Sequence, residues 1–359
     1  MPARGFQDTF GRAHRAFAAG DFRLARDRYR RGWKQAASVA EQFAALLGAG
    51  RACLGLGNFG EALQYLDAAL ELCTPEASAP DVAVATAHHA TAQALLGLGR
   101  LREAHRHVGR ALARRVSALG EGHRATLSSL SLLGVLHHRL GHLHRAGTLQ
   151  RQCLQLRRAS LGPDDPDVTA SLQALAQVHF ARERFKQALQ LHQQALRQVL
   201  ARREDRPGLQ QRLHEAAAWN AVGQALHRDG QHEAAEWHFA RAEAEFLDCL
   251  GAQHPQTASV WQNLAALHLH RAPRRSLAWG RKALRVLRKT LGDEHLETAA
   301  AEVLVANCLY RCGQFKAAHE TLLRAIAVQE RQLSERHPEL RKTRRLAVEI
   351  ASAASSHLP

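Results

Sequence analysis

The sequence predicts an all-α fold built as an array of helical pairs, on three observations. A loop that begins with Leu and, in four of five copies, Gly recurs as LGEGHRAT, LGPDDPDV, LGAQHPQT, LGDEHLET and LSERHPEL. A second pattern, Gly-x-hydrophobic-x-x-Ala, runs in phase with this loop at steps of 42 residues. Ala, Leu, Arg, Gln and Glu, which favour helices, dominate the chain, whereas aromatic residues make up only 5%. A fixed period of this length is the signature of a repeat architecture.

Each repeat is predicted to be a helix, a tight turn and a second helix. Gly57, Gly99 and Gly141 lie 42 residues apart at the turn, where glycine tolerates the positive φ that ends a helix. Five residues after each glycine comes an alanine, such as Ala62 after Gly57. We expect these alanines where two helices approach too closely for a larger side chain.

The recurring loop is predicted to end one repeat and to start the next. Gly120 and Gly251 come where the second helix of a repeat must stop. Pro166 and Pro255 lie near the first turn of the next helix, where a missing N–H costs nothing. The loop is therefore structural. Its recurrence indicates a row of equivalent helical pairs, each of which buries one face on its neighbours.

These features resemble the tetratricopeptide repeat, and more narrowly its long variety found in kinesin light chains. That variety shares the extended second helix and the LGxxHP connection, here LGAQHP. The resemblance covers roughly residues 7 to 333 and implies a right-handed α–α superhelix of about eight helix-turn-helix units. It also implies that the first helices line a concave groove. Two features depart from the family pattern: the seventh unit has HRAPRRSLAWG in place of a glycine turn, and the first two units lack the LGxxHP loop.

The repeat register divides the chain into four segments. The step from Glu183 to Gly230 is 47 residues, five more than the repeat. We expect the extra residues to form an exposed loop, a hinge or an extension of a helix. The predicted segments are units one to five at 7–200, an inserted loop or hinge at 201–215, units six to eight at 216–333, and a C-terminal capping helix and tail at 334–359.

The composition limits the compartment and the partners. Lys and Arg exceed Asp and Glu by 49 to 33, a net charge of +16, and such a surface attracts nucleic acid, anionic lipid or acidic protein segments. The N-terminal stretch MPARGFQDTFGRAHRAF lacks the apolar region of a secretory signal, and no apolar run is long enough to cross a membrane. The six cysteines show no paired spacing and are predicted to be free thiols in a reducing compartment. We therefore expect a cytoplasmic protein.

The sequence predicts no enzyme, no cofactor and no bound metal ion. GLGNFG at 55–60 matches GxGxxG, but it lies at a helix–helix turn, whereas a dinucleotide-binding fingerprint follows a strand. HHRLGHLH at 137–144 spans a repeat turn, so its imidazoles point in several directions rather than toward one metal ion. The carboxylates are scattered over the predicted helices, with no pair suited to acid/base catalysis.

Matched positions on the first helices predict the binding residues. Side-chain amides recur at two neighbouring positions, and an amide can pair with both the N–H and the C=O groups of an extended peptide. A third position, one turn further, carries arginines and a histidine, and arginine pairs with carboxylates as a bidentate fork. The predicted groove residues are His89, Gln93, Ser131, Arg139, Gln173, Gln177, Asn220, Gln224, Arg228, Gln262, Asn263, His270, Asn307 and Arg311.

The predicted function is that of a non-catalytic adaptor or scaffold that binds an acidic peptide of a partner protein in the concave groove. Kinesin-light-chain-like arrays are associated with peptides that combine acidic residues with an aromatic anchor, so the resemblance supports an acidic partner. Two alternatives stay open: a nucleic-acid-associated basic protein and an assembly module of a larger complex. Nucleic acid is the less favoured partner, because binding a strand needs stacking aromatics and many of the 19 Phe, Trp and Tyr residues fall in repeat-core positions.

Overall fold

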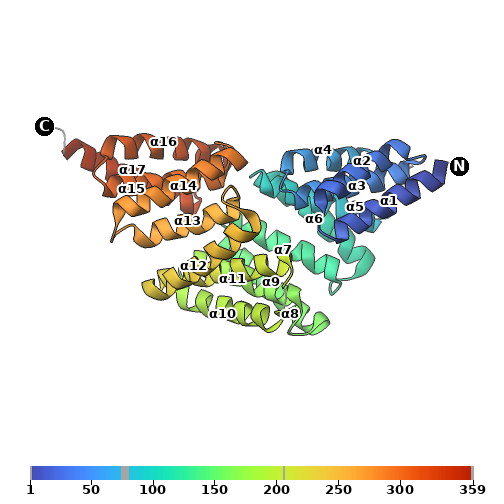
Figure 1. Ribbon diagram of the computed structural model, residues 1–359, viewed down its shortest axis with the longest axis horizontal. Helices are drawn as coiled ribbons and strands as arrows, with labels where there is room; N and C mark the ends of the chain where they lie inside the picture. Colours follow the sequence, from blue (N-terminus) through green and yellow to red (C-terminus); the bar gives the residue numbers. More distant parts are fainter. Residues whose placement is uncertain (1, 74–80, 205–206, 357–359) are drawn as a thin grey trace. The chain divides into compact units, whose positions relative to one another are not determined.

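The computed structural model describes residues 2–73, 81–204 and 207–356, and every regular element within these ranges is an α-helix (Figure 1). The helices are α1 (Pro2–Ala18), α2 (Phe22–Gln35), α3 (Val39–Gly55), α4 (Phe59–Glu71), α5 (Asp81–Gly97), α6 (Leu101–Leu119), α7 (Arg124–Arg139), α8 (Leu143–Leu161), α9 (Pro166–Ala181), α10 (Phe185–Ala201), α11 (Leu209–Arg228), α12 (His232–Leu250), α13 (Pro255–His268), α14 (Pro273–Leu291), α15 (Leu296–Arg311), α16 (Phe315–Gln332) and α17 (Pro338–Ser356). In the described ranges, eight helical pairs are followed by α17. The predicted all-α repeat fold with a closing helix is confirmed.

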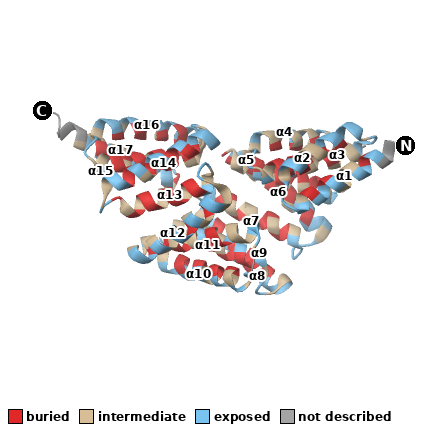
Figure 2. Cartoon of the chain, viewed as in Figure 1, coloured by how far each residue is buried: buried red, intermediate tan, exposed pale blue. Residues whose placement is uncertain are grey.

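The small residues predicted at the helix contacts are fully buried. The positions that follow the turns have 0% exposure at Ala25, Ala62, Ala104, Ala146, Ala188, Ala235 and Ala318. In the seventh pair this position is Ser276, whose hydroxyl donates to the carbonyl oxygen of Ala265 at 2.6 Å, so the polar group is satisfied inside the core. Buried residues accordingly follow the helix faces that meet their neighbours (Figure 2).

The turn inside a pair is built in three ways. Most pairs use a glycine at positive φ, for example +73° at Gly57 and +79° at Gly141. The fifth pair has Glu183 there, with a φ of 59°, which is the one positive φ at a non-glycine residue in the part of the chain that the structure describes. The seventh pair has no glycine, and α14 instead begins at Pro273, whose fixed φ suits the first position of a helix.

The recurring loops cap the helices that follow them, and the histidine of the loop is the capping group. The Nδ1 atom of the histidine accepts a hydrogen bond from the backbone N–H two residues later, at 3.1–3.2 Å, at His123, His254, His295 and His337. Asp165 does the same with a carboxylate oxygen at 2.8 Å. Each loop therefore satisfies one of the backbone donors that a helix start leaves without a partner.

The chain forms two compact bodies. The N-terminal body comprises Met1–Arg139 with Gln155–Ser160, and the C-terminal body comprises Leu140–Leu154 with Leu161–Pro359. The core of the C-terminal body runs from Leu189 on α10 to Ile350 on α17. All six cysteines of the chain are free thiols, as predicted. Burial raises the pKa of Cys53 to about 12, so this thiol stays protonated and acts as a small apolar side chain.

The inserted residues 201–215 divide between a connection and a helix. Helix α10 ends at Ala201 and α11 begins at Leu209, so residues 209–215 extend α11 to 20 residues. Residues 205–206 of this segment, like 357–359 of the predicted tail, lie outside the described residues. Gln211 in the extension donates from Nε2 to the carbonyl oxygen of Arg202 at 2.9 Å, which ties the start of α11 to the end of α10.

The last helix of the C-terminal body contacts two earlier turns of the same body. The Nζ atom of Lys342 on α17 lies 3.3 Å from Oε1 of Glu183, between residues that are 159 positions apart. A Cβ atom on Gly141 would lie 2.8 Å from Pro338, so the missing side chain lets the start of α17 approach the turn before α8. The C-terminal body is therefore held by this contact in addition to the packing of neighbouring helices.

Candidate functional site

The predicted groove residues lie where the repeat register places them, and none of the fourteen is buried. Thirteen lie on first helices, whereas His270 follows α13, which ends at His268. The exposed ones are Gln93, Arg139, Gln177, Arg228, His270 and Arg311, and the other eight are half-buried. His89, Gln93, Ser131 and Arg139 belong to the N-terminal body and the other ten to the C-terminal body.

Three of the predicted amides are joined in the C-terminal body. Nε2 of Gln224 donates to Oδ1 of Asn263 at 3.2 Å, and Nδ2 of Asn263 donates to Oδ1 of Asn220 at 2.7 Å. The amides of α11 and α13 therefore order one another. Within the described residues, Oε1 of Gln224 accepts no hydrogen bond and the Nδ2 group of Asn220 donates none. Gln224 therefore offers an acceptor to a ligand, and Asn220 offers a donor.

The two predicted groove arginines of the C-terminal body lie over aromatic rings. The guanidinium carbon of Arg228 lies 4.4 Å from the ring centre of Phe185 and 5.6 Å from that of Phe180. The guanidinium carbon of Arg311 lies 5.9 Å from the ring centre of Tyr310 on its own helix. Stacking occupies one face of a guanidinium and leaves the N–H groups at its edge available for carboxylates.

His89 in the N-terminal body takes part in a structural network and is not an open groove residue. Its Nδ1 lies 3.2 Å from Oγ of Ser129, and that oxygen accepts a hydrogen bond from buried Arg115 at 2.8 Å. Burial, together with the positive charge of Arg115, lowers the pKa of His89 to about 3. The imidazole is therefore neutral near pH 7, and it links α5 to α7.

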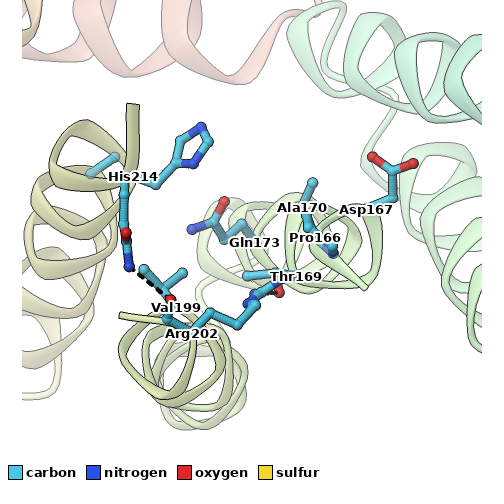
Figure 3. Close-up of a pocket in the computed structure, with 10 residues that line it drawn as sticks. Pro166, Asp167, Thr169, Ala170, Gln173, Val199, Arg202 and His214 are labelled. Atoms are coloured by element: carbon cyan, nitrogen blue, oxygen red, sulfur yellow. Dashed lines mark hydrogen bonds between the residues drawn. The ribbon is translucent and has the colours of Figure 1, made fainter. Parts of the chain in front are cut away.

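A cavity of about 420 Å³ opens between α9, α10 and α11, with the predicted groove residue Gln173 in its wall (Figure 3). The other lining residues are Pro166, Asp167, Thr169, Ala170, Val199, Arg202, Gln211, His214 and Ala217. Figure 3 shows Gln173 and His214 projecting from α9 and α11 toward the same space. Proline, alanine and valine side chains supply the apolar part of the wall, so the cavity offers an apolar recess with polar groups around it.

Arg202 places a positive charge at the cavity, and the wall also contains the carboxylate of Asp167. Its Nε donates to the carbonyl oxygen of Gln198 at 2.9 Å, its Nη1 to that of Asp164 at 3.1 Å, and its Nη2 to the Thr169 hydroxyl. All three partners are neutral, and no carboxylate in the described part of the chain forms an ion pair with Arg202. The hydrogen bonds hold the guanidinium in place without compensating its charge.

Of the residues that line the cavity, only Gln173 was predicted from the sequence. The available signal was the 47-residue step between Glu183 and Gly230. The extra residues lengthen α11, and the cavity lies between α11 and α9, the first helix of the pair before the insertion. The cavity thus lies where the repeat register breaks.

The side chains at these positions are suited to recognition. In residues 2–73, 81–204 and 207–356, no group of three or more His, Cys, Asp or Glu side chains is placed to hold a metal ion. Within the same residues, no helix combines the length and the apolar character that crossing a membrane requires. The groove and the cavity present amides, guanidinium groups, imidazoles, the carboxylate of Asp167 and apolar surface, which bind ligands by hydrogen bonds, charge and burial.

Solved structures with this fold are similar to almost the whole chain. A Rap protein complexed with competence and sporulation factor has a TM-score of 0.64 at 12% identity, over 98% of this chain and 99% of that chain. The Rap conjugation gene regulator of the plasmid pLS20, in complex with the Phr* peptide, has a TM-score of 0.65 at 13% identity, over 91% and 96%. Identities this low show a shared fold.

Kinesin-light-chain-like repeats are also similar to this chain. A putative kinesin light chain of nearly identical repeats from Podosopora anserina is 20% identical over 56% of this chain and 94% of that chain, with a TM-score of 0.42. No curated protein matches the chain. The model of the tetratricopeptide repeat matches residues 41–117, 125–200 and 214–289, which together make up more than half of the chain. The chain therefore belongs to the tetratricopeptide repeat family.

Proposed function

We propose that this chain is a non-catalytic adaptor that holds an extended acidic peptide of a partner protein along its first helices. In this proposal one side chain of the peptide enters the cavity between α9 and α11, and residues 209–215, which lengthen α11, act as the spacer that opens it. The observation that carries the proposal is the cavity itself, which adjoins a predicted groove residue, Gln173, and contains the uncompensated charge of Arg202. Free thiols suit the reducing conditions of the cytoplasm.

Similar folds with bound peptides support this function. The structure of the pLS20 Rap regulator is a complex with the Phr* peptide, and its fold matches 91% of this chain. A cavity of about 420 Å³ lies within the range of pockets that enclose a compact ligand. A large side chain of a peptide, such as an aromatic ring, has a size and an apolar surface that fit the recess.

The amides supply a means of holding the peptide backbone. The linked side chains of Asn220, Gln224 and Asn263 leave a donor and an acceptor toward a ligand. Because these amides already order one another, they lose less side-chain freedom when a peptide binds. They pair with backbone groups and leave the choice of peptide to the cavity and to charge.

The cations supply the preference for acidic residues. Arg202 has neutral partners, and the exposed guanidinium groups of Arg228 and Arg311 have no ion pair in the described residues. Carboxylates on a peptide would pair with these groups as bidentate forks. Such exposed pairs are screened by salt, so affinity should fall as ionic strength rises.

The test is the binding of a fluorescein-labelled acidic peptide, SDEEWDEES, measured by fluorescence anisotropy. Two matched peptides replace its tryptophan by alanine or its acidic residues by lysine. The variant Ala170→Trp fills the cavity from an exposed position of α9. We expect it to weaken binding by about tenfold or more, as loss of an anchor pocket does, and to leave the melting temperature close to that of the wild type.

The matched control is Ala300→Trp, at the equivalent exposed position of α15. We expect this variant to bind the acidic peptide as the wild type does. An equal loss in both variants would show that the added ring obstructs the helices in general, and the anchoring cavity would be rejected. Equal binding of all three peptides to the wild type would contradict both the aromatic anchor and the acidic preference.

A further inference from the structure

The second helix of the seventh pair, α14, has a face made of basic side chains. Its sequence, PRRSLAWGRKALRVLRKTL, contains no acidic residue. At about 100° per residue, all its basic residues fall within an arc of about 140°, and all are exposed: Arg274, Arg275, Arg281, Lys282, Arg285, Arg288 and Lys289. The opposite face, which includes Ala283, Leu284 and Leu287, is buried. We call the exposed arc the basic face of α14.

Most of the charge on the basic face is uncompensated. Arg288 pairs with Asp293 at 3.1 Å and with Glu302 at 2.5 Å. The other six basic side chains have no ion pair among the residues that the structure describes. The first helix of the same pair, α13, contains no Lys, Arg, Asp or Glu. This surface is therefore separate from the groove residues of α13 and has its own electrostatic character.

One tryptophan ring borders the basic face, and a second tryptophan lies on the preceding pair. Trp279 lies at the edge of the arc, stacked on Trp261 with 6.3 Å between ring centres, and Nζ of Lys282 lies 4.9 Å from the centre of the Trp279 ring. On α12, the second helix of the preceding pair, Trp237 is 55% exposed, and the guanidinium carbon of Arg241 lies 6.0 Å from its ring centre. Each of two successive pairs thus places a cation beside an accessible or half-buried indole ring.

We propose that the basic face of α14 binds a single strand of nucleic acid. Phosphates would lie on the guanidinium and ammonium groups, and Arg, which forms bidentate forks with phosphate, predominates over Lys on this face. At about 1.5 Å per residue the face is about 22 Å long, enough for several consecutive phosphates. Stacking on Trp279 requires bases that are not paired, which favours a single strand over a duplex.

This proposal reverses an expectation from the sequence. Nucleic acid was the less favoured partner because the aromatic residues were expected in repeat cores. Trp261 is indeed fully buried, but Trp279 is half-buried and Trp237 is exposed, and both accompany cations. The combination of a basic stripe with an accessible ring, that of Trp279, was left unresolved by the sequence and is present on α14.

An anionic membrane is the competing occupant, and the structure favours it less. Amphipathic helices bind membranes by inserting their apolar face, but the apolar face of α14 is packed against α13 and α15. Within the basic arc, Ala278 is an exposed apolar residue of negligible size. A membrane would therefore meet charges alone, whereas a nucleic-acid strand would use the charges and the ring of Trp279.

The experiment measures binding of a fluorescein-labelled oligouridine to the full chain as a function of salt. For about six neutralised phosphates, the logarithm of the binding constant should fall with the logarithm of salt concentration with a slope of about −4. The triple variant R274Q/R281Q/R285Q should reduce the magnitude of this slope by about 2 and weaken binding at least tenfold near physiological salt.

The matched control is the triple variant R102Q/R106Q/R110Q, which removes three exposed arginines from α6 and makes the same change in net charge. We expect its oligouridine binding to stay close to that of the wild type. An equal loss in both triple variants would assign binding to net charge and overturn the proposal. Tighter binding of a duplex of the same length would also overturn the proposal. The same holds if oligouridine does not bind and phosphatidylserine vesicles bind in a way that depends on α14. The α14 variant should still bind the acidic peptide, which keeps this proposal and the adaptor function separately testable.

Discussion

The guanidinium carbon of Arg228 lies 4.4 Å from the ring centre of Phe185, so the last residue of α11 rests on the first residue of α10. Phe180 on α9 lies within 5.6 Å of the same carbon. A side chain predicted from its repeat position as a groove cation therefore also joins three consecutive helices. The ring contact on one face of the guanidinium group stabilises the fold, and the N–H groups at its edge stay available to a ligand.

Replacing Arg228 by alanine should measurably destabilise the C-terminal body. Exposed cation–π pairs contribute about 0.5–1 kcal/mol, and we expect the free energy of unfolding in urea to fall by that amount. Arg311→Ala is the comparison, because Arg311 lies 5.9 Å from a ring on its own helix and joins no other helix through it. A loss as large in Arg311→Ala as in Arg228→Ala would contradict the role given to the Phe185 contact.

The loop histidines should behave as helix caps. His254→Ala removes the acceptor of the Gln256 N–H and should lower the free energy of unfolding by about 1 kcal/mol. His254→Asp should retain most of the stability, because Asp165 performs the same capping in another loop. Urea denaturation of both variants checks this pair of outcomes, and equal stabilities would count against capping as the role of the ring.

Acid should weaken the folded state through buried histidines. Burial lowers the pKa of His192 to about 4, and burial together with the nearby His107 lowers that of His88 to about 4. In the unfolded chain a histidine titrates near 6.5, so unfolding takes up protons between pH 6.5 and pH 4. The contribution of these side chains to stability is complete above pH 6.5 and is lost progressively as the pH falls toward 4.

The measurement for this acid effect is the urea midpoint at pH 7.5 and at pH 5. In the wild type the midpoint should fall, and in His192→Gln it should fall less, because one of the titrating side chains is gone. His14→Gln, outside this set of buried histidines, is the control and should keep the full pH dependence. If His192→Gln and the wild type lost the same stability over this pH range, the assignment to His192 would be wrong.

Enlarging a side chain at a helix contact should damage the array locally. Ala188 has no exposed surface, and forcing leucine into such a site typically costs about 1–3 kcal/mol. Hydrogen exchange should show lost protection in α9, α10 and their direct neighbours, since repeats depend mainly on the repeats beside them. Ala300→Leu, at an exposed position of α15, should leave protection unchanged.

The repeat pattern was sufficient to predict the helical pairs, because packing in each pair depends on positions at fixed spacing. Ala146 and Ala188 were identified from that spacing, and both are fully buried. The capping by His254 was not predicted, although Asp165 at the matching place of another loop was a visible hint. A sequence pattern shows that a position recurs in each repeat. It does not show which atom of the side chain forms the hydrogen bond.

The site could be predicted only in part. Gln173 followed from the register, but the cavity beside it depends on how five extra residues divide between a connection and a longer α11. His89 also followed from the register, yet it bonds to Ser129 on another helix, which in turn accepts a hydrogen bond from Arg115. Repeat position predicts the face on which a side chain lies. The partners of that side chain depend on side chains of other helices, which the repeat position does not specify.

The ion pair between Lys342 and Glu183 forms only when a particular number of repeats separates the two residues. In an open array a repeat can be gained or lost without effect on distant ones, because each touches its neighbours alone. Here the start of α17 also rests on the turn at Gly141. One helical pair more or fewer would carry α17 away from both turns and leave Lys342 without its carboxylate. Duplication or deletion of a single repeat between these turns and α17 would therefore break contacts that join repeats far apart in the C-terminal body.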